Sequence, residues 1–137
     1  MPEWLAKVKA REKGISDSRA NLVALIEHLD DGIGKVIQSL KKSGKFENTL
    51  IVFMSDNGGL VSNGSNNGDL RGTKTGMYEG GIRIPACVSW PKYIAPNSSN
   101  SERVISMDIF PTIIDIIGIK NNSIVDGVSL LPLLTAK

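Results

Sequence analysis

The fold class is indicated most clearly by the segment N-T-L-I-V-F-M-S-D-N-G-G, from Asn48 to Gly59. Its first half contains the continuous apolar run Leu50 to Met54, which is typical of a strand covered on both faces in a parallel sheet. The second half is polar and ends in glycines, so the strand is expected to end there in a turn. Because ligands of open α/β sheets lie beyond the carboxyl ends of the strands, Asp56 and Asn57 are the first candidate functional residues.

Upstream, a long amphipathic helix is predicted between Ser16 and Lys42. Its apolar residues recur at spacings of three and four, which places them in one stripe: Leu22, Leu25, Ile26, Leu29, Ile33, Val36, Ile37 and Leu40. Ser16 or Asp17 can cap the start of this helix, and Gly44 can end it. Residues 1–15 show no clear period, so we predict an N-terminal arm or a short helix there, without chemistry of its own.

Downstream, a long polar loop is followed by a second predicted strand, Ile82 to Trp90. A second amphipathic helix is predicted over residues 109–117, with Pro111 tolerated in its first turn. The order helix, strand, loop, strand, helix predicts an α/β layered fold with mostly parallel strands flanked by helices. The chain has 137 residues, of which 41% are apolar, and this is enough for one such domain, which we place at residues 16–137.

Composition excludes several classes of protein. No apolar run approaches the roughly 18 to 20 residues of a membrane span, and no basic segment leads into an apolar one as in a secretory signal. We therefore expect neither a membrane partner nor a signal peptide in this chain. The net charge is +2 and aromatic residues make up 5%, without a basic stripe, so we also expect no nucleic acid partner.

Metal sites built from clusters of cysteine or histidine are excluded as well, because the chain has one cysteine, Cys87, and one histidine, His28. Cys87 is predicted to be a buried strand residue, and His28 to be a structural residue on the flank of the first helix. The acidic pair Asp30-Asp31 lies within that helix, where successive side chains point about 100° apart, so we predict a surface pair. Any metal site must therefore use oxygen ligands.

Two segments can carry chemistry. Asp56 and Asn57 offer carboxylate and amide oxygens, the hard donors that Ca²⁺ or Mg²⁺ prefers, although the same residue types also form plain Asx turns. The segment Leu70 to Arg83 combines cationic side chains with a glycine-rich backbone, which suits an anionic substrate such as a sulfate or phosphate ester. The alternative for that segment is a solvated loop held by salt bridges between Glu79 and its arginines.

Taken in this order, the segments resemble the sulfatase family within the alkaline phosphatase superfamily. The resemblance runs from about Asn21 to Leu134, and five stretches carry it: L-D-D-G-I-G at Leu29 to Gly34, N-T-L-I-V-F-M-S-D-N-G-G at Asn48 to Gly59, L-R-G-T-K-T-G-M-Y-E-G-G-I-R-I-P at Leu70 to Pro85, D-I-F-P-T-I-I-D-I-I-G at Asp108 to Gly118, and D-G-V-S-L-L-P-L-L at Asp126 to Leu134. The second and third stretches are the most specific.

The resemblance implies roles for individual residues. Asp56 and Asn57 match two ligands of a divalent ion, usually Ca²⁺ although Mg²⁺ is possible. Lys74 matches a lysine that contacts the sulfate of the substrate. Three further positions are implied to shape the loop instead of taking part in chemistry: Arg71, Glu79 and Arg83.

One motif of the family is absent from this chain. Sulfatases hydrolyse sulfate esters with a formylglycine made from the first residue of C-x-P-x-R or S-x-P-x-R, and neither sequence occurs here. The resemblance implies that this motif and a first aspartate pair for the metal lie in an N-terminal half. We therefore expect the chain to be a C-terminal piece of a sulfatase catalytic domain that is inactive alone. The alternatives are a phosphoester or phosphonate hydrolase of the same superfamily and a non-catalytic α/β module.

Two expectations concern location and self-association. Members of the family are often periplasmic, secreted or lysosomal, and the sequence itself leaves the location open. Without the strands of the N-terminal half, the apolar strand Leu50 to Met54 would expose its edges, so we expect copies of the chain to associate with each other.

Overall fold

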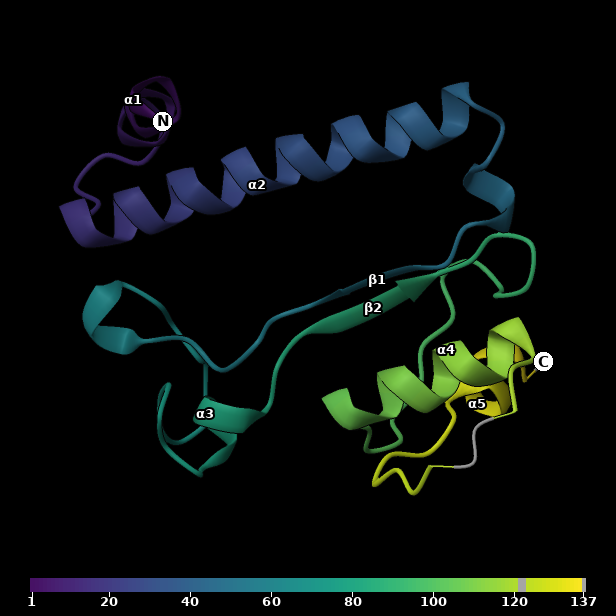
Figure 1. Cartoon of the computed structure of the whole chain (residues 1–137). Coiled ribbons are helices and arrows are strands. Elements are labelled where there is room, and N and C mark those ends of the chain that lie inside the picture. The colour runs from purple at the N-terminus through teal and green to yellow at the C-terminus, as the bar shows by residue number, and fades with distance from the viewer. Residues whose placement is uncertain (121–122, 137) are drawn as a thin grey trace. The chain divides into compact units, whose positions relative to one another are not determined.

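The computed structural model describes residues 1–120 and 123–136, and the chain divides into two compact units, Met1–Ser89 and Trp90–Lys137. The first unit contains helices α1 (Pro2–Arg11), α2 (Asp17–Lys42) and α3 (Glu79–Ile82), strands β1 (Ile51–Met54) and β2 (Ala86–Ser89), and 3₁₀ turns η1 (Phe46–Asn48) and η2 (Val61–Asn63) (Figure 1). The second unit contains η3 (Ser106–Asp108), α4 (Ile109–Ile117) and α5 (Leu131–Thr135). Among the described residues, no helix is both long and apolar enough to cross a membrane.

The long predicted helix is confirmed as α2. The hydroxyl oxygen of Ser16 accepts a hydrogen bond from the backbone N–H of Arg19 at 3.3 Å, so Ser16 is the cap, as the sequence suggested. Gly44 follows the end of the helix with φ of 69°, a left-handed conformation that glycine adopts without a steric penalty. The helix predicted over residues 109–117 is likewise confirmed, as α4.

The core of the first unit lies between α1 and α2. Val8 of α1 packs against Ala20 and Ala24 of α2, and all three side chains are fully buried. Lys9 pairs with Asp17 at 2.7 Å across the two helices, and this contact lowers the pKa of the Asp17 carboxyl. Of the two structures considered for the N-terminal segment, the short helix is therefore the one that forms. The domain boundary placed after residue 15 stays a prediction.

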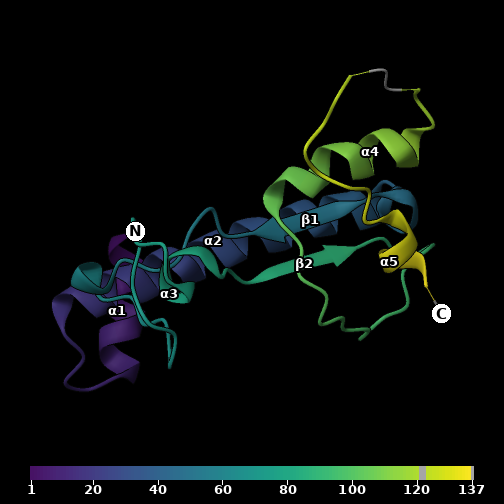
Figure 2. The same cartoon turned by 90° about the horizontal axis from the view of Figure 1, so that it is seen from below.

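The sheet differs from the expected one. In the described residues β1 pairs with β2 in antiparallel register, from Ile51 opposite Ser89 to Met54 opposite Ala86, and the two strands run side by side in both views (Figures 1 and 2). The prediction of mostly parallel strands is therefore wrong for this part of the chain. A parallel pair needs a crossover of a dozen or more residues, usually a helix, to carry the chain back to the starting edge. The connection here contains only the 3₁₀ turn η2 and the single-turn α3, with no helix long enough to cross the sheet, so the chain returns beside β1 in the opposite direction.

The two strands are also more exposed than predicted. Phe53 of β1 lies opposite Cys87 of β2, so both side chains share one face of the pair, and both are exposed. Cys87 is thus a strand residue as predicted but not a buried one, because the face that it shares with Phe53 is exposed. The second strand also begins later than predicted, since Ile82 belongs to α3.

The second unit is built around a buried carboxylate, that of Asp108. One of its oxygens accepts from the N–H of Ile105 at 2.8 Å, and the other accepts from the N–H of Val128 at 2.9 Å. Thr112 extends the connection, since its hydroxyl donates to the carbonyl of Asp108 at 2.6 Å and accepts from the N–H of Leu130 at 2.8 Å. These bonds fasten the segment before α5 to the first turn of α4.

Replacing Asp108 by asparagine is expected to destabilise the chain by about 1–3 kcal/mol, because the amide NH₂ would face a part-buried backbone N–H and leave it without an acceptor. The matched control is Asp115→Asn, an exposed aspartate on α4 that accepts from the hydroxyl of Ser129 at 2.6 Å. A hydroxyl can reverse its role, so this change should cost less than about 0.5 kcal/mol. Urea unfolding of both variants measures the difference, and equal losses would show that the Asp108 carboxylate does not hold this unit together.

Candidate functional site

The two candidate metal ligands lie in a tight turn at the end of β1. The Asp56 carboxylate accepts from the backbone N–H of Asn57 at 3.0 Å, and the Ser55 hydroxyl donates to the carbonyl of Asn57 at 2.8 Å. The Asn57 side-chain NH₂ donates to the carbonyl of Gly58 at 2.9 Å. The Asp56 bond reaches only the next residue, whereas an Asx turn needs the N–H two residues on, so these local bonds fix the backbone of both side chains without forming an Asx turn.

Glycines join this turn to α3. The N–H of Gly58 donates to the carbonyl of Gly81 at 2.8 Å, and a Cβ on Gly58 would overlap the carbonyl of Gly80. Gly80 is equally confined on its other side, since its N–H donates to the carbonyl of Arg71 at 2.7 Å and a Cβ would overlap the carbonyl of Gly72. Three backbone segments thus pass within contact distance of one another, which only residues without a side chain permit.

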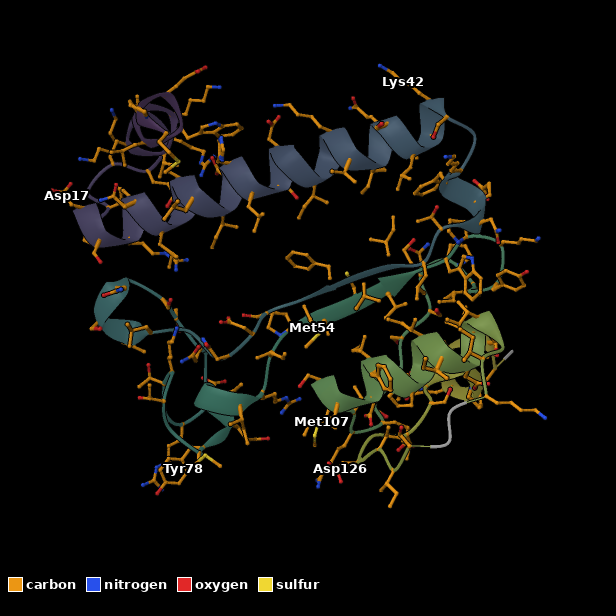
Figure 3. The ribbon with its side chains drawn as sticks, in the orientation of Figure 1. Asp17, Lys42, Met54, Tyr78, Met107 and Asp126 are labelled. Carbon is orange, nitrogen blue, oxygen red and sulfur yellow. The ribbon has the colours of Figure 1, made fainter. Side chains whose placement is uncertain are left out.

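A second set of hydrogen bonds converges on Gly59. Its N–H donates to the side-chain oxygen of Asn67 at 2.9 Å. Its carbonyl accepts from the Asn67 side-chain NH₂ at 3.0 Å, from the Thr73 hydroxyl at 2.8 Å and from the backbone N–H of Lys74 at 3.2 Å. The backbone of Lys74 is therefore hydrogen-bonded to Gly59, two residues beyond Asn57, although 17 positions separate Lys74 from Asn57 in the sequence. In Figure 3 this loop runs between Met54, at the end of β1, and Tyr78, just before α3.

The positions implied to shape the loop are exposed and form local contacts. The guanidinium of Arg71 stacks 3.8 Å from the centre of the Tyr78 ring. Glu79 pairs with Arg83 at 3.4 Å along α3, so one of the two salt bridges considered from the sequence forms, while Arg71 turns to an aromatic ring. Contacts of this kind between exposed side chains stabilise the loop only weakly.

Other candidate residues lie away from this loop. Asp30 and Asp31 are on α2, where Lys35 pairs with Asp31 at 2.6 Å and lowers the pKa of that carboxyl. His28 is exposed, and its ring meets the Trp4 ring edge to face at 5.9 Å. In residues 1–120 and 123–136, no three side chains of His, Cys, Asp or Glu gather closely enough to hold a metal ion.

The residues of the turn fit part of an oxygen-based metal site. The Asp56 side chain is exposed, and the donating end of the Asn57 amide is already engaged by the Gly58 carbonyl. The amide oxygen is then the end of Asn57 left to coordinate. Since Ca²⁺ takes about six to eight oxygen ligands, these two residues can supply only a share of such a site.

Comparisons with known proteins agree on one family. The family model described as Sulfatase matches residues 2–119. The steryl-sulfatase of Rattus norvegicus is 37% identical over 119 residues, which cover 80% of this chain and 21% of that protein. A sulfatase of Formosa agariphila is 38% identical over 125 residues, covering 84% of this chain and 22% of that protein. The chain thus spans about a fifth of the length of these curated relatives.

Solved structures show the same likeness. The crystal structure of Ps i-CgsB in complex with k-i-k-neocarrahexaose superposes with a TM-score of 0.90 at 35% identity, over 96% of this chain and 29% of that one. The structure of BT4656 in complex with its substrate D-glucosamine-2-N,6-O-disulfate has a TM-score of 0.74 at 31% identity, over 85% of this chain and 23% of that one.

Proposed function

Because this chain belongs to the sulfatase family, we propose that it supplies part of the active site of an enzyme that hydrolyses sulfate esters. In this proposal Asp56 and Asn57 are ligands of a divalent cation, Ca²⁺ or Mg²⁺, and Lys74 contacts the sulfate. The nucleophile, a formylglycine, belongs to another part of the protein. The complete enzyme is here this chain together with the part that carries the nucleophile.

One observation carries the proposal, namely the convergence of hydrogen bonds on Gly59. It ties the backbone of Lys74 to the segment that begins with Asp56 and Asn57. Catalytic groups are useful only when their positions relative to each other are fixed to within about 0.5 Å. The two hydrogen bonds between the Asn67 side chain and the backbone of Gly59 supply that rigidity in a loop that has almost no regular secondary structure.

The chemistry of these groups suits an ester whose reacting group is an anion, as the sulfate of a sulfate ester is. A divalent cation, when bound, withdraws charge from the oxygens of the sulfate and stabilises the charge that develops in the transition state. Lys74 adds a compact ammonium, which binds sulfate as a point charge. Arg71 places further positive charge in the same segment and favours the approach of an anion, whereas the charge of Arg83 is balanced by Glu79.

Replacing Lys74 by glutamine in the complete enzyme is expected to lower kcat/KM for 4-nitrophenyl sulfate by about 10- to 100-fold. This is the range for losing one hydrogen bond that involves a charged group, about 1.5–3 kcal/mol. Lys45→Gln is the matched control, because Lys45 is an exposed lysine outside the loop and its substitution should leave the rate within about twofold.

The same assay tests the reaction class. Parallel assays with 4-nitrophenyl phosphate should give a much lower kcat/KM than the sulfate ester. A preference for the phosphate ester, or equal rates in the two lysine variants, would contradict the proposed role of Lys74 in sulfate ester hydrolysis.

A further inference from the structure

A hollow of about 590 Å³ lies between the start of α2 and the loop that follows η2. Figure 1 shows η2 beside the first turns of α2. The lining is mostly polar, with hydroxyl, amide and guanidinium groups from Ser16, Ser65, Asn66, Asn67 and Arg19, while Val61 and Leu70 add apolar surface. Its volume falls in the range of small-molecule sites, about 300–1,000 Å³.

The two sides of this hollow, the start of α2 and the loop after η2, are in direct contact. The Arg19 guanidinium donates to the carbonyl of Gly64 at 3.0 Å. Gly64 has φ of 85°, and a Cβ at this position would lie 2.8 Å from the Cα of Arg19, so the loop backbone touches the helix. The site is therefore fixed from both sides, by the capped first turn of α2 and by a loop conformation at Gly64 that glycine accommodates.

Arg19 keeps unused binding capacity. Its guanidinium carries five N–H donors, of which the bond to Gly64 uses one. No carboxylate in the described part of the chain forms an ion pair with it, in contrast to Arg11, which pairs with Glu12 and Glu27. A guanidinium of this kind is suited to a carboxylate or sulfate of a ligand, which it can bind through two parallel hydrogen bonds.

The hollow shares residues with the loop that carries Lys74. Asn67 lines it and at the same time bonds to both backbone groups of Gly59, the residue that also accepts from Lys74. Gly72, another lining residue, accepts from the Asn67 side chain at 3.1 Å. The hollow and the backbone that carries Lys74 are thus joined through the Asn67 side chain and Gly59.

We propose that the hollow binds the alcohol half of the substrate, and that this alcohol is a saccharide with an anionic substituent that Arg19 contacts. This inference rests on the proposed sulfate ester hydrolysis. Sugar hydroxyls match the hydroxyl of Ser65 and the amide NH₂ of Asn66, whereas the Asn67 amide is already bonded to Gly59 and Gly72. A steroid or a plain aromatic alcohol would cover these groups and the Arg19 charge without replacing their hydrogen bonds to water, which is unfavourable.

The first test compares two substrates of the complete enzyme, 4-nitrophenyl sulfate and a sulfated disaccharide that contains a uronate. For Arg19→Gln, the ratio of kcat/KM for the disaccharide to kcat/KM for the aryl ester should fall at least tenfold. The control Arg103→Gln, an exposed arginine in the second unit, should leave this ratio unchanged. Equal losses on both substrates would mean that Arg19 only supports the loop, and they would overturn the proposal, as would preferential hydrolysis of a steroid sulfate.

A second measurement does not depend on hydrolysis and so separates this proposal from the proposed function. The 137-residue chain is titrated with the same disaccharide after removal of its sulfate ester, and amide signals are followed by NMR. We expect the signals of Gly64, Ser65 and Asn66 to shift at millimolar concentrations and the shifts to disappear in Arg19→Gln. Shifts without sulfate ester hydrolysis by the complete enzyme would contradict the proposed function alone, whereas absence of shifts would overturn the saccharide site.

Discussion

Replacing Asp56 by alanine in the complete enzyme is expected to reduce kcat/KM for a sulfate ester by about 1,000-fold or more. The proposed cation contributes several kcal/mol to transition-state stabilisation, and about 4 kcal/mol corresponds to that factor. Asp56 provides a full negative charge to the site, which its neighbour Asn57 does not. Its loss therefore removes both a ligand and the charge that balances the cation.

The matched control is Asp69→Ala, an exposed aspartate in the same polar loop, which should retain wild-type activity within about twofold. The metal content of both variants can be measured by elemental analysis alongside the rates.

For the 137-residue chain alone we expect Ca²⁺ affinity no tighter than millimolar, because two residues supply too few ligands. Normal activity and metal content in Asp56→Ala, or micromolar binding by the chain alone, would contradict the partial site.

Replacing Gly80 by alanine is expected to lower the same kcat/KM by about 100-fold or more. The new Cβ would overlap the Gly72 carbonyl and lie 2.8 Å from the Arg71 carbonyl, so the loop that carries Lys74 must shift. A displacement of about 1 Å at a reacting group can reduce the rate by about 100-fold. The effect acts on the position of Lys74 without changing any charge.

Gly32→Ala serves as the control for this prediction. Gly32 lies within α2, and a Cβ there meets no atom within 4 Å. Alanine at an exposed helical position should stabilise the protein by about 0.5–1 kcal/mol and leave the rate unchanged. If Gly80→Ala were as active as Gly32→Ala, the close backbone packing would not be what positions the loop.

The helices could be predicted from the sequence because their signals are local. Ser16 and Gly44 mark the ends of α2, and the spacing of apolar residues between them has the period of a helix. The pairing of β1 with β2 could not be predicted in the same way, since the apolar run from Leu50 to Met54 is compatible with either strand direction. Direction is decided by the return path of the loop, which has no periodic signal.

The candidate site could be predicted only in part, because some of its residues have a recognisable sequence signal and others do not. Asp56 and Asn57 stand out because they follow an apolar strand, and Lys74 because it lies in a distinctive stretch of sequence. Asn67 and Thr73, which hold that stretch in place, were missed because side chain to backbone hydrogen bonds in polar loops leave no periodic pattern. The only available signal was the unusual density of asparagine and glycine between η2 and α3.

Self-association of the chain stays a prediction. It rests on the edges of the strand Leu50 to Met54, and the structure adds apolar side chains on α2 that remain about half exposed or more: Leu25, Ile26, Leu29 and Val36. In the complete enzyme we expect the part that carries the nucleophile to cover this face, because apolar patches of this kind are unfavourable in water.

We propose that this chain contributes a sulfate-binding lysine and two metal ligands to an active site whose nucleophile lies elsewhere in the protein. The decisive experiment is steady-state hydrolysis of 4-nitrophenyl sulfate by the purified 137-residue chain and by the complete enzyme. We expect turnover by the complete enzyme that falls in the Lys74→Gln variant, and none above background by the chain alone. Turnover by the chain alone that Lys74→Gln abolishes would show that the proposed division of the active site is wrong.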